Sequence, residues 1–404
     1  MQPISILIWR SLPALALAGC LCLSAYAQPA KTPRRDSPAK PQPTAARQPI
    51  ELRVGMTPDQ WTYKEGAVEF IEHKGTKALK INAQSGVVIL KDINFKDGTI
   101  EFDVEINQFM PAPTLYFRRK DANETECVYL RSRYGAKKNA PDHVQYASIV
   151  KGVNMWDLQH EFQTSADIRV NEWNHLKLVV SGKQLRVYVN NMQQPALEIP
   201  CLEGDSMEGS IALETGQPGT AIFANLVIKP GLVDDLPAAA TPDITQHEVR
   251  YIRHWQVSKP EPLPNGKELN AAMLPTEAMT WEPMQTERRA ILNLTRKFGR
   301  SDQRRYVWVK AKIKSEMAQK QLLKMGFSDE MWVFINQKPI HTDKNLYRLG
   351  MRKDPDGRLS IDNCSFVLPL QKGDNELLIG LANDFYGWGI MAQLENVDGI
   401  ELIK

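Results

Sequence analysis

Apolar and polar residues alternate with a period of two along the first half of the chain. In the stretch 100–106, four apolar residues alternate with three acidic ones. Leu176–Val180 and Leu185–Val189 alternate in the same way on either side of a Ser181-Gly182-Lys183 turn. Short strands with turn residues at intervals of about 8–12 positions are typical of a β-sandwich. One packed face and one wet face further indicate antiparallel sheets.

The second half of the chain carries the same pattern. A strand is expected over His247–Val257, and Tyr306–Ile313 alternates apolar with polar residues. Met331–Ile340 predicts a hairpin, and Gly373–Ile379 predicts another strand. We therefore expect an all-β protein with two β-sandwich (jelly-roll) domains.

The first residues have the features of an export signal. Arg10 precedes an apolar run over Leu12–Leu23, and Ala25-Tyr26-Ala27 forms a cleavage site of the A-x-A type. Cleavage after Ala27 predicts a periplasmic or secreted protein. Leu17–Cys20 also resembles a bacterial lipobox, so the alternative is an envelope protein with a lipid anchor at Cys20.

Two changes in composition divide the rest of the chain. The segment 28–49 is rich in Pro, Ala and basic residues and lacks large apolar groups, which is typical of a disordered tether. A second change spans Lys229–Thr245 and marks a linker. We therefore expect five segments along the chain: signal peptide 1–27, tether 28–49, sandwich 50–230, linker 231–246 and sandwich 247–404.

Composition and charge exclude several classes of protein. The 50 basic and 47 acidic residues leave a net charge of +3, too small for a nucleic-acid-binding face. Beyond the signal, the sequence has no run of about 18 apolar residues that would span a membrane. It also lacks a P-loop, a dinucleotide fingerprint, a G-x-S-x-G elbow and an H-E-x-x-H pair.

Cysteine and acidic motifs give little reason to expect a cofactor or a metal. Cys127, Cys201 and Cys364 lie far apart without a C-x-x-C pair. They are either three small buried residues or include a Cys127–Cys201 bridge. Asp354–Gly357 resembles a calcium turn but lacks the further ligands of a loop site. We therefore expect no cofactor, and a structural calcium ion has no clear motif.

Two segments of the first half give a family resemblance. Asp97–Val104 resembles the early strand of concanavalin A-like lectin/glucanase sandwiches. Asn171–Val180 followed by Gln184–Asn190 is similar to the hairpin of laminin-G-like and keto-disaccharide hydrolase-type domains. Asn191 stands where that hairpin usually has glycine, and asparagine tolerates the left-handed conformation of such a turn. The resemblance covers residues 60–230 and implies a sandwich fold more than one activity.

The second half resembles galactose-binding-like jelly rolls. Met331–Ile340 is similar to their V-W-V-N-G-K hairpin, with Gln337 in place of glycine, and Gly373–Ile379 to their G-x-N-x-L strand. Such domains accompany carbohydrate-active enzymes, as sugar-binding modules or as scaffolds. The resemblance therefore implies a glycan partner.

Three carboxylates form the enzymatic candidate. Glu101, Asp103 and Glu105 follow the E-x-D-x-E pattern that the sequence shares with laminarinase-like glucanases, and period two places them on one strand face. A retaining glycosidase needs two carboxyl groups about 5–5.5 Å apart. The alternative is the polar outer face of an ordinary strand.

A second candidate is a surface that binds sugar. Tyr116 and Arg118 are expected on one face of a strand, and Tyr129 and Arg131 on one face of another. Aromatic rings stack on apolar sugar faces, and arginine donates paired hydrogen bonds. Trp156 would cap the resulting groove. The alternative is cross-strand pairing that only stabilises the sheet.

Aromatic and polar residues of the second half form a third candidate, a sugar platform of Trp332, Asn383, Asp384, Tyr386 and Trp388. Gly387 and Gly389 would permit close approach of the backbone to a ligand. The alternative is a set of core aromatics and a turn.

The sequence leaves three functions open. They are an exported lectin-like protein, a glycoside hydrolase or keto-glycoside-cleaving enzyme that uses Glu101, Asp103 and Glu105, and a structural interaction protein of the cell envelope.

Overall fold

A computed structural model describes residues 50–107, 112–132, 140–216, 219–231, 233–347 and 350–404. The signal peptide, the tether and Cys20 lie outside these residues. Residues Pro49–Lys404 form one compact unit. No helix among the described residues is long and apolar enough to cross a membrane.

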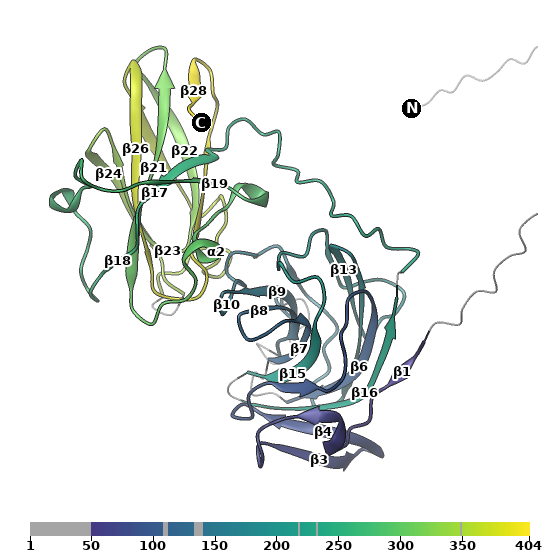
Figure 1. Cartoon of the computed structure of the whole chain (residues 1–404). Coiled ribbons are helices and arrows are strands. Elements are labelled where there is room, and N and C mark those ends of the chain that lie inside the picture. The colour runs from purple at the N-terminus through teal and green to yellow at the C-terminus, as the bar shows by residue number, and fades with distance from the viewer. Residues whose placement is uncertain (1–49, 108–111, 133–139, 217–218, 232, 348–349) are drawn as a thin grey trace, which may run out of the picture. The chain divides into compact units, whose positions relative to one another are not determined.

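Two antiparallel sheets form the first sandwich (Figure 1). Sheet I has the order β14 (Leu197–Ile199), β13 (Gln184–Val189), β12 (Trp173–Ser181), β6 (Gly98–Ile106), β16 (Thr220–Pro230), β4 (Thr76–Asn82) and β3 (Val68–His73), with β1 (Leu52–Arg53) on β16. Sheet II has the order β10 (Val153–Asn154), β9 (Val144–Val150), β8 (Glu124–Leu130), β7 (Pro113–Arg119), β15 (Ser210–Thr215), β5 (Val88–Leu90) and β2 (Trp61–Thr62), with β11 (Gln163–Thr164) on β9.

The alternating pattern decides which face of each strand is buried. In β6 the apolar residues Ile100, Phe102 and Val104 are buried, and the residues between them are half-exposed. Phe117 and Tyr146 of sheet II pack into the same core from the opposite side. The core therefore lies between the two sheets, as the period of two predicts.

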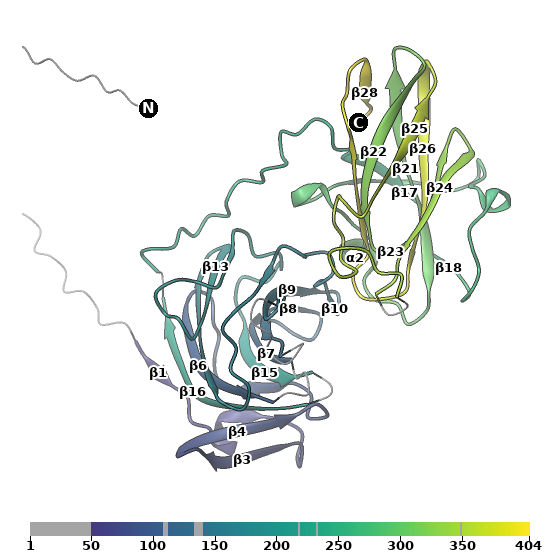
Figure 2. The same cartoon turned by 180° about the vertical axis from the view of Figure 1, so that it is seen from behind.

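Two further sheets form the second sandwich (Figure 2). Sheet III has the order β19 (Glu282–Gln285), β17 (His254–Val257), β21 (Arg305–Ser315), β26 (Gly373–Asn383), β23 (Asp329–Ile335) and β24 (Lys338–Asn345), with β18 (Glu261–Pro262) and β28 (Ile400–Leu402) on β21. Sheet IV has the order β20 (Leu292–Asn293), β27 (Gly389–Leu394), β22 (Gln319–Phe327) and β25 (Cys364–Leu370). The predicted all-β class with two sandwiches is confirmed.

Helical elements are short among the described residues. The helix α2 spans Leu294–Phe298, and three single turns complete the set: η1 (Pro58–Gln60), η2 (Ala271–Met273) and η3 (Arg288–Ala290). The Asn293 side chain caps α2 by accepting a hydrogen bond from the Arg296 N–H at 3.1 Å.

The structure corrects two local expectations and agrees with a third. After β13 the left-handed residue is Asn190, with φ of 58°, rather than Asn191. The Asn190 side chain accepts a hydrogen bond from the His175 N–H at 2.9 Å, which holds it in that conformation. Between β23 and β24, Gln337 does adopt a left-handed φ of 65°, as its place in the hairpin requires. The strand expected over His247–Val257 is confined to β17.

The segment between β16 and β17 is irregular but packs against sheet I. Leu236 is buried against Val179 and Tyr188 on the outer face of sheet I. The Ala238 carbonyl accepts a hydrogen bond from the Lys183 N–H at 2.8 Å. A Cβ atom at Gly182 would lie 2.0 Å from the Ala238 oxygen, so this contact requires glycine. The segment predicted as a linker is thus fixed to the first sandwich.

Candidate functional site

Aromatic side chains from both sandwiches line a groove of about 650 Å³. We call it the composite groove. Its walls include Tyr116, Tyr129, Arg131, Trp156 and Glu214 from the first sandwich and Tyr347, Phe385 and Tyr386 from the second. Four residues predicted to bind ligand therefore come together here with a fifth, Tyr386, from the other predicted candidate surface.

Strand pairing explains why the two tyrosines meet. Tyr116 on β7 pairs with Cys127 on β8, and Tyr129 pairs with Thr114. Both tyrosines lie on the outer face of sheet II, because Leu115 and Val128 between them point into the core. Burial raises the pKa of both phenols above their usual value. They therefore stay neutral at physiological pH.

Arg131 packs against the aromatic wall. Its guanidinium lies 4.8 Å from the centroid of the Tyr129 ring, and it donates hydrogen bonds to the Tyr129 hydroxyl and to the Gln145 side chain. The Gln145 side chain in turn donates to the Trp156 carbonyl at 3.2 Å. Gln145 is fully buried, so it fixes Arg131 and the Trp156 loop relative to each other.

Trp156 is the centre of the aromatic cluster. Its ring lies 5.1 Å from Tyr347 and 5.9 Å from Tyr386, both edge to face. The buried guanidinium of Arg358 lies 4.7 Å from its centroid. Trp156 thus joins the outer face of sheet II to the second sandwich, beyond the capping role that the sequence suggested for it.

Arg118 does not share the face of Tyr116, which corrects the expectation from strand alternation. The register shifts between Ser210 and Ala212, so Phe117 and Arg118 lie opposite one residue of β15 and form a bulge. Arg118 has φ of 48° and is fully buried. It donates to the Asp97 carboxylate at 2.9 Å and to the Lys96 carbonyl at 2.7 Å. It is a structural ion pair away from the groove.

Burial also corrects the predicted platform of the second sandwich. Trp388 is fully buried in the core between sheets III and IV. Trp332 lies on the outer face of sheet III, where it is 3% exposed beneath the segment 263–281. Asn383 is buried as well, and Asp384 lines a separate pocket of about 300 Å³ with Tyr386. Only Tyr386 of this group reaches the composite groove.

The three carboxylates of β6 do share one face, as predicted, but it is the outer face of sheet I. Each lies beside basic groups, at these shortest distances: Asp103–His175 2.7 Å, Glu105–Lys74 2.6 Å and Glu101–Lys229 3.1 Å. Burial opposes ionisation, but hydrogen bonds from His175 and Lys74 lower the pKa of Asp103 and of Glu105 respectively. A general acid needs the opposite shift. These carboxylates do not line the composite groove.

Sequence reasoning missed Glu214, the carboxylate of the groove. It lies on β15, which pairs with β7, and it accepts a hydrogen bond from the Tyr116 hydroxyl. The alternation of Ile211 and Leu213 places Glu214 on the outer face. That signal was present in the sequence, but it did not show which strand β15 would pair with.

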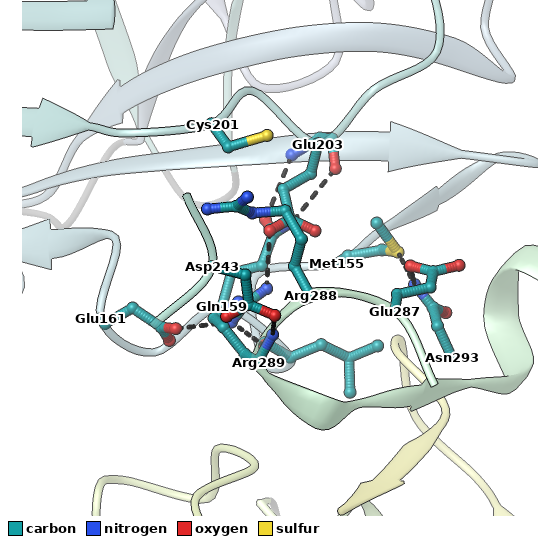
Figure 3. Close-up of polar contacts among 12 residues, drawn as sticks. Met155, Gln159, Glu161, Cys201, Glu203, Asp243, Glu287, Arg288, Arg289 and Asn293 are labelled. Atoms are coloured by element: carbon teal, nitrogen blue, oxygen red, sulfur yellow. Dashed lines mark hydrogen bonds and ion pairs between the residues drawn. The ribbon is translucent and has the colours of Figure 1, made fainter. Parts of the chain in front are cut away.

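Ion pairs at Arg289 hold the two sandwiches together. Arg289 donates to Glu161 at 2.7 Å and to Glu203 at 2.9 Å (Figure 3). Its backbone N–H donates to Asp243 at 3.1 Å. The guanidinium lies 5.0 Å from the Phe162 centroid. Arg289 therefore ties the second sandwich both to the first and to the segment that joins them.

Two buried carboxylates position the loop that carries Tyr386. The Gly387 N–H donates to both oxygens of Asp157, at 3.0 and 3.1 Å. The N–H groups of Asp384 and Phe385 donate to Asp329 at 2.6 and 3.0 Å. A Cβ atom at Gly387 would lie 2.5 Å from the Asp157 oxygen. The close approach that the sequence suggested for Gly387 is thus to another part of the chain.

Asp157 is expected to make stability depend on pH. Burial raises its pKa to about 7 from the usual 3.8. Between these values the folded state keeps a proton that the unfolded state has released, so stability falls as pH rises through this window. Asp157→Asn should therefore gain stability relative to the wild type from about pH 4 to about pH 7, by up to about 1.4 kcal/mol per pH unit.

Urea denaturation at about pH 4.5 and about pH 8 measures this difference. Asp302→Asn is the control, because its side chain is 91% exposed and the same substitution there removes no buried carboxyl group. An equal difference for Asp157→Asn at both pH values would contradict the assignment.

The three cysteines predicted to lie outside the signal are free thiols, and arginine ion pairs hold the turn that resembles a calcium site. Cys127, Cys201 and Cys364 are all free, so the Cys127–Cys201 bridge does not form. The Asp356 carboxylate lies 3.2 Å from Arg352 and 3.3 Å from Arg358. It is paired with arginines, which agrees with the expectation of an ordinary turn.

Several solved structures resemble part of this chain. The carbohydrate-binding module CBM66 from Bacillus subtilis has 19% identity, and the match covers 42% of this chain and 95% of that chain with a TM-score of 0.32. A Bacillus licheniformis β-glucanase has 10% identity, with 45% and 98% of the chains covered and a TM-score of 0.33. A putative glycosyl hydrolase from Parabacteroides distasonis has 13% identity, with 45% and 100% covered and a TM-score of 0.33.

The first sandwich matches a known family model. The sequence has no match among curated proteins. Residues 50–229 match the model of the 3-keto-alpha-glucoside-1,2-lyase-like domain. The match begins just before β1 and ends in β16, so it spans sheets I and II. The keto-disaccharide hydrolase-type resemblance is thereby confirmed for residues 50–229, which are similar to the 3-keto-alpha-glucoside-1,2-lyase-like domain.

Proposed function

We propose that this protein is exported and binds a glycan in the composite groove. The observation that carries the proposal is the wall of aromatic rings, drawn from both sandwiches, around the planar guanidinium of Arg131. The volume of about 650 Å³ lies within the usual range for small-ligand sites, about 300–1,000 Å³. Such a groove accommodates a short saccharide.

The chemistry of the walls suits a sugar ring. Tyr386 is 46% exposed and offers a ring for the apolar C–H face of a saccharide. Arg131 is half-buried, and its fork of N–H donors matches pairs of hydroxyl oxygens. Glu214 on the same wall can accept hydrogen bonds from hydroxyl groups. Stacking and paired hydrogen bonds thus act on one ligand from two sides.

Removing either contact should weaken glycan binding by about tenfold or more, which corresponds to about 1.4 kcal/mol. The variants are Tyr386→Ala and Arg131→Ala, and calorimetry against plant and bacterial cell-wall polysaccharides and their oligosaccharides measures the affinity. The matched controls are Tyr63→Ala and Arg53→Ala, which lie outside the groove. Equal losses in the controls, or wild-type affinity in both groove variants, would contradict the proposal.

A keto-glycoside-cleaving enzyme is the second candidate. It is favoured by the match to a lyase-like domain and by the Glu214–Tyr116 pair inside the groove. The glycan samples of the binding experiment distinguish the two, because cleavage leaves shorter products that mass spectrometry detects. Intact glycans after long incubation favour a binding protein. Absence of both binding and cleavage across a broad panel would favour a structural role in the cell envelope.

A further inference from the structure

Three metal-ligating side chains meet at an open edge of the second sandwich. They are His341 and Asp343 on β24 and Cys364 at the start of β25. The strands β24 and β25 are the edge strands of sheets III and IV and are both labelled in Figure 2. This edge is separate from the composite groove, whose lining includes none of the three residues.

Strand register turns all three side chains inward. His341 pairs with Val333 and Asp343 with Met331, and those partners belong to the core between the sheets. Cys364 packs against the same core from sheet IV. No spacing pattern in the sequence points to this cluster, because its ligands come from two sheets and Cys364 lies far along the chain from Asp343.

The distances suit a cation better than direct hydrogen bonds. One ligand atom from each residue lies within 4.8 Å of the other two. His341 Nε2 and Asp343 Oδ2 are 3.5 Å apart, which is long for a hydrogen bond. Two ligands at about 2.0–2.1 Å from a tetrahedral zinc ion are about 3.3 Å apart. A small contraction of the cluster would therefore complete the coordination.

His341 offers a nitrogen with no other use among the described residues. Its Nε2 atom is buried and makes no hydrogen bond there. The ring stacks on Phe366, with centroids 4.3 Å apart and an angle of 18° between the planes. Stacking holds the imidazole in place, and a neutral imidazole nitrogen is a common metal ligand.

We propose that His341, Asp343 and Cys364 bind a zinc ion that links the edges of sheets III and IV. Nitrogen, oxygen and sulfur ligands together suit Zn²⁺. Three protein ligands leave a fourth position for water. Because the ligands come from both sheets, the ion would close the open edge of the sandwich and stabilise it.

Binding requires two local changes. Asp343 Oδ2 lies 2.8 Å from the Lys353 ammonium, and the Cys364 thiol donates to the Met325 carbonyl at 3.6 Å. The zinc ion replaces the ammonium at that oxygen. The thiol releases its proton to the buffer, and the resulting thiolate donates an electron pair to the ion. No oxidant or reductant takes part.

Cobalt(II) is the probe that tests the site in the full chain. After treatment with a chelator, the wild type should bind one equivalent of Co²⁺ with thiolate-to-cobalt charge-transfer absorption, and Zn²⁺ should displace the cobalt and raise Tm. Cys364→Ser should lose the absorption. His341→Ala should weaken Zn²⁺ binding by at least about 100-fold.

Cys201→Ser is the control, because this cysteine lies between β14 and β15 of the first sandwich. It should keep the absorption and the rise in Tm. Circular dichroism confirms that each variant is folded, and Asp343→Asn provides a further variant with little change in volume. A wild type without thiolate absorption in excess Co²⁺, or an absorption that survives Cys364→Ser, would overturn the proposal. The inward charges would then serve only to protect the sheet edges from pairing.

Discussion

Arg289→Ala is expected to lower the free energy of unfolding by about 3 kcal/mol, because it removes one partner of a partly buried ion-pair cluster. The Arg289 side chain is 17% exposed and lies between Glu161 and Glu203 (Figure 3). Without it, the Glu203 carboxylate, 8% exposed, loses its arginine partner. Chemical denaturation of the full chain measures the loss.

Arg288→Ala is the matched control for this prediction. Arg288 is the preceding residue, but its guanidinium donates to the Thr241 carbonyl at 2.8 Å and to no carboxylate in the described contacts. The control should cost about 1 kcal/mol. Equal effects of the two variants would contradict the role given to Arg289. Because the groove takes its walls from both sandwiches, Arg289→Ala should also weaken glycan binding.

Asp97→Ala should destabilise the first sandwich by a similar amount, about 3–5 kcal/mol. One oxygen of this carboxylate accepts hydrogen bonds from Arg118 at 2.9 Å and from the Gly182 N–H at 2.7 Å. Arg118 is fully buried, so the variant leaves a guanidinium inside the protein without that carboxylate. The midpoint of urea denaturation reports the change.

A double-mutant cycle separates this charge effect from a loss of packing. Adding Arg118→Leu to Asp97→Ala removes the buried guanidinium that has lost its carboxylate partner. The double variant should therefore be more stable than Asp97→Ala alone. Asp374→Ala, at an exposed position at the start of β26, is the control and should have little effect. Additive losses in the cycle would show that the buried ion pair is not the cause.

Much of the candidate site could be predicted from local sequence. Alternation placed Tyr129 and Arg131 on one face of a strand, and this pairing of aromatic and cationic side chains indicated a sugar-binding surface. Those features depend only on residues two positions apart on one strand, so they can be predicted without knowing which strand pairs with it. The same reasoning placed Glu101, Asp103 and Glu105 together on one face.

The incorrect predictions for Arg118, Trp332 and Trp388 all arise from contacts with segments that are distant in the sequence. Arg118 left the face of Tyr116 because a bulge, set by the register with β15, interrupts the alternation. Trp332 and Trp388 were expected on a sugar platform, but one is covered by the segment 263–281 and the other lies in the core. An aromatic residue has the same local pattern whether it is covered or exposed. Burial depends on segments distant in sequence.

Local sequence was sufficient to predict the all-β class, the two sandwiches and the strand face that Tyr129 and Arg131 share. These follow from the period of two and from turn chemistry, which act over a few residues. The packing of segments distant in the sequence brought Glu214 beside Tyr116, Tyr386 beside Trp156 and Cys364 beside His341. Such pairs depend on strand order and on how the two sandwiches pack, and no local pattern encodes either.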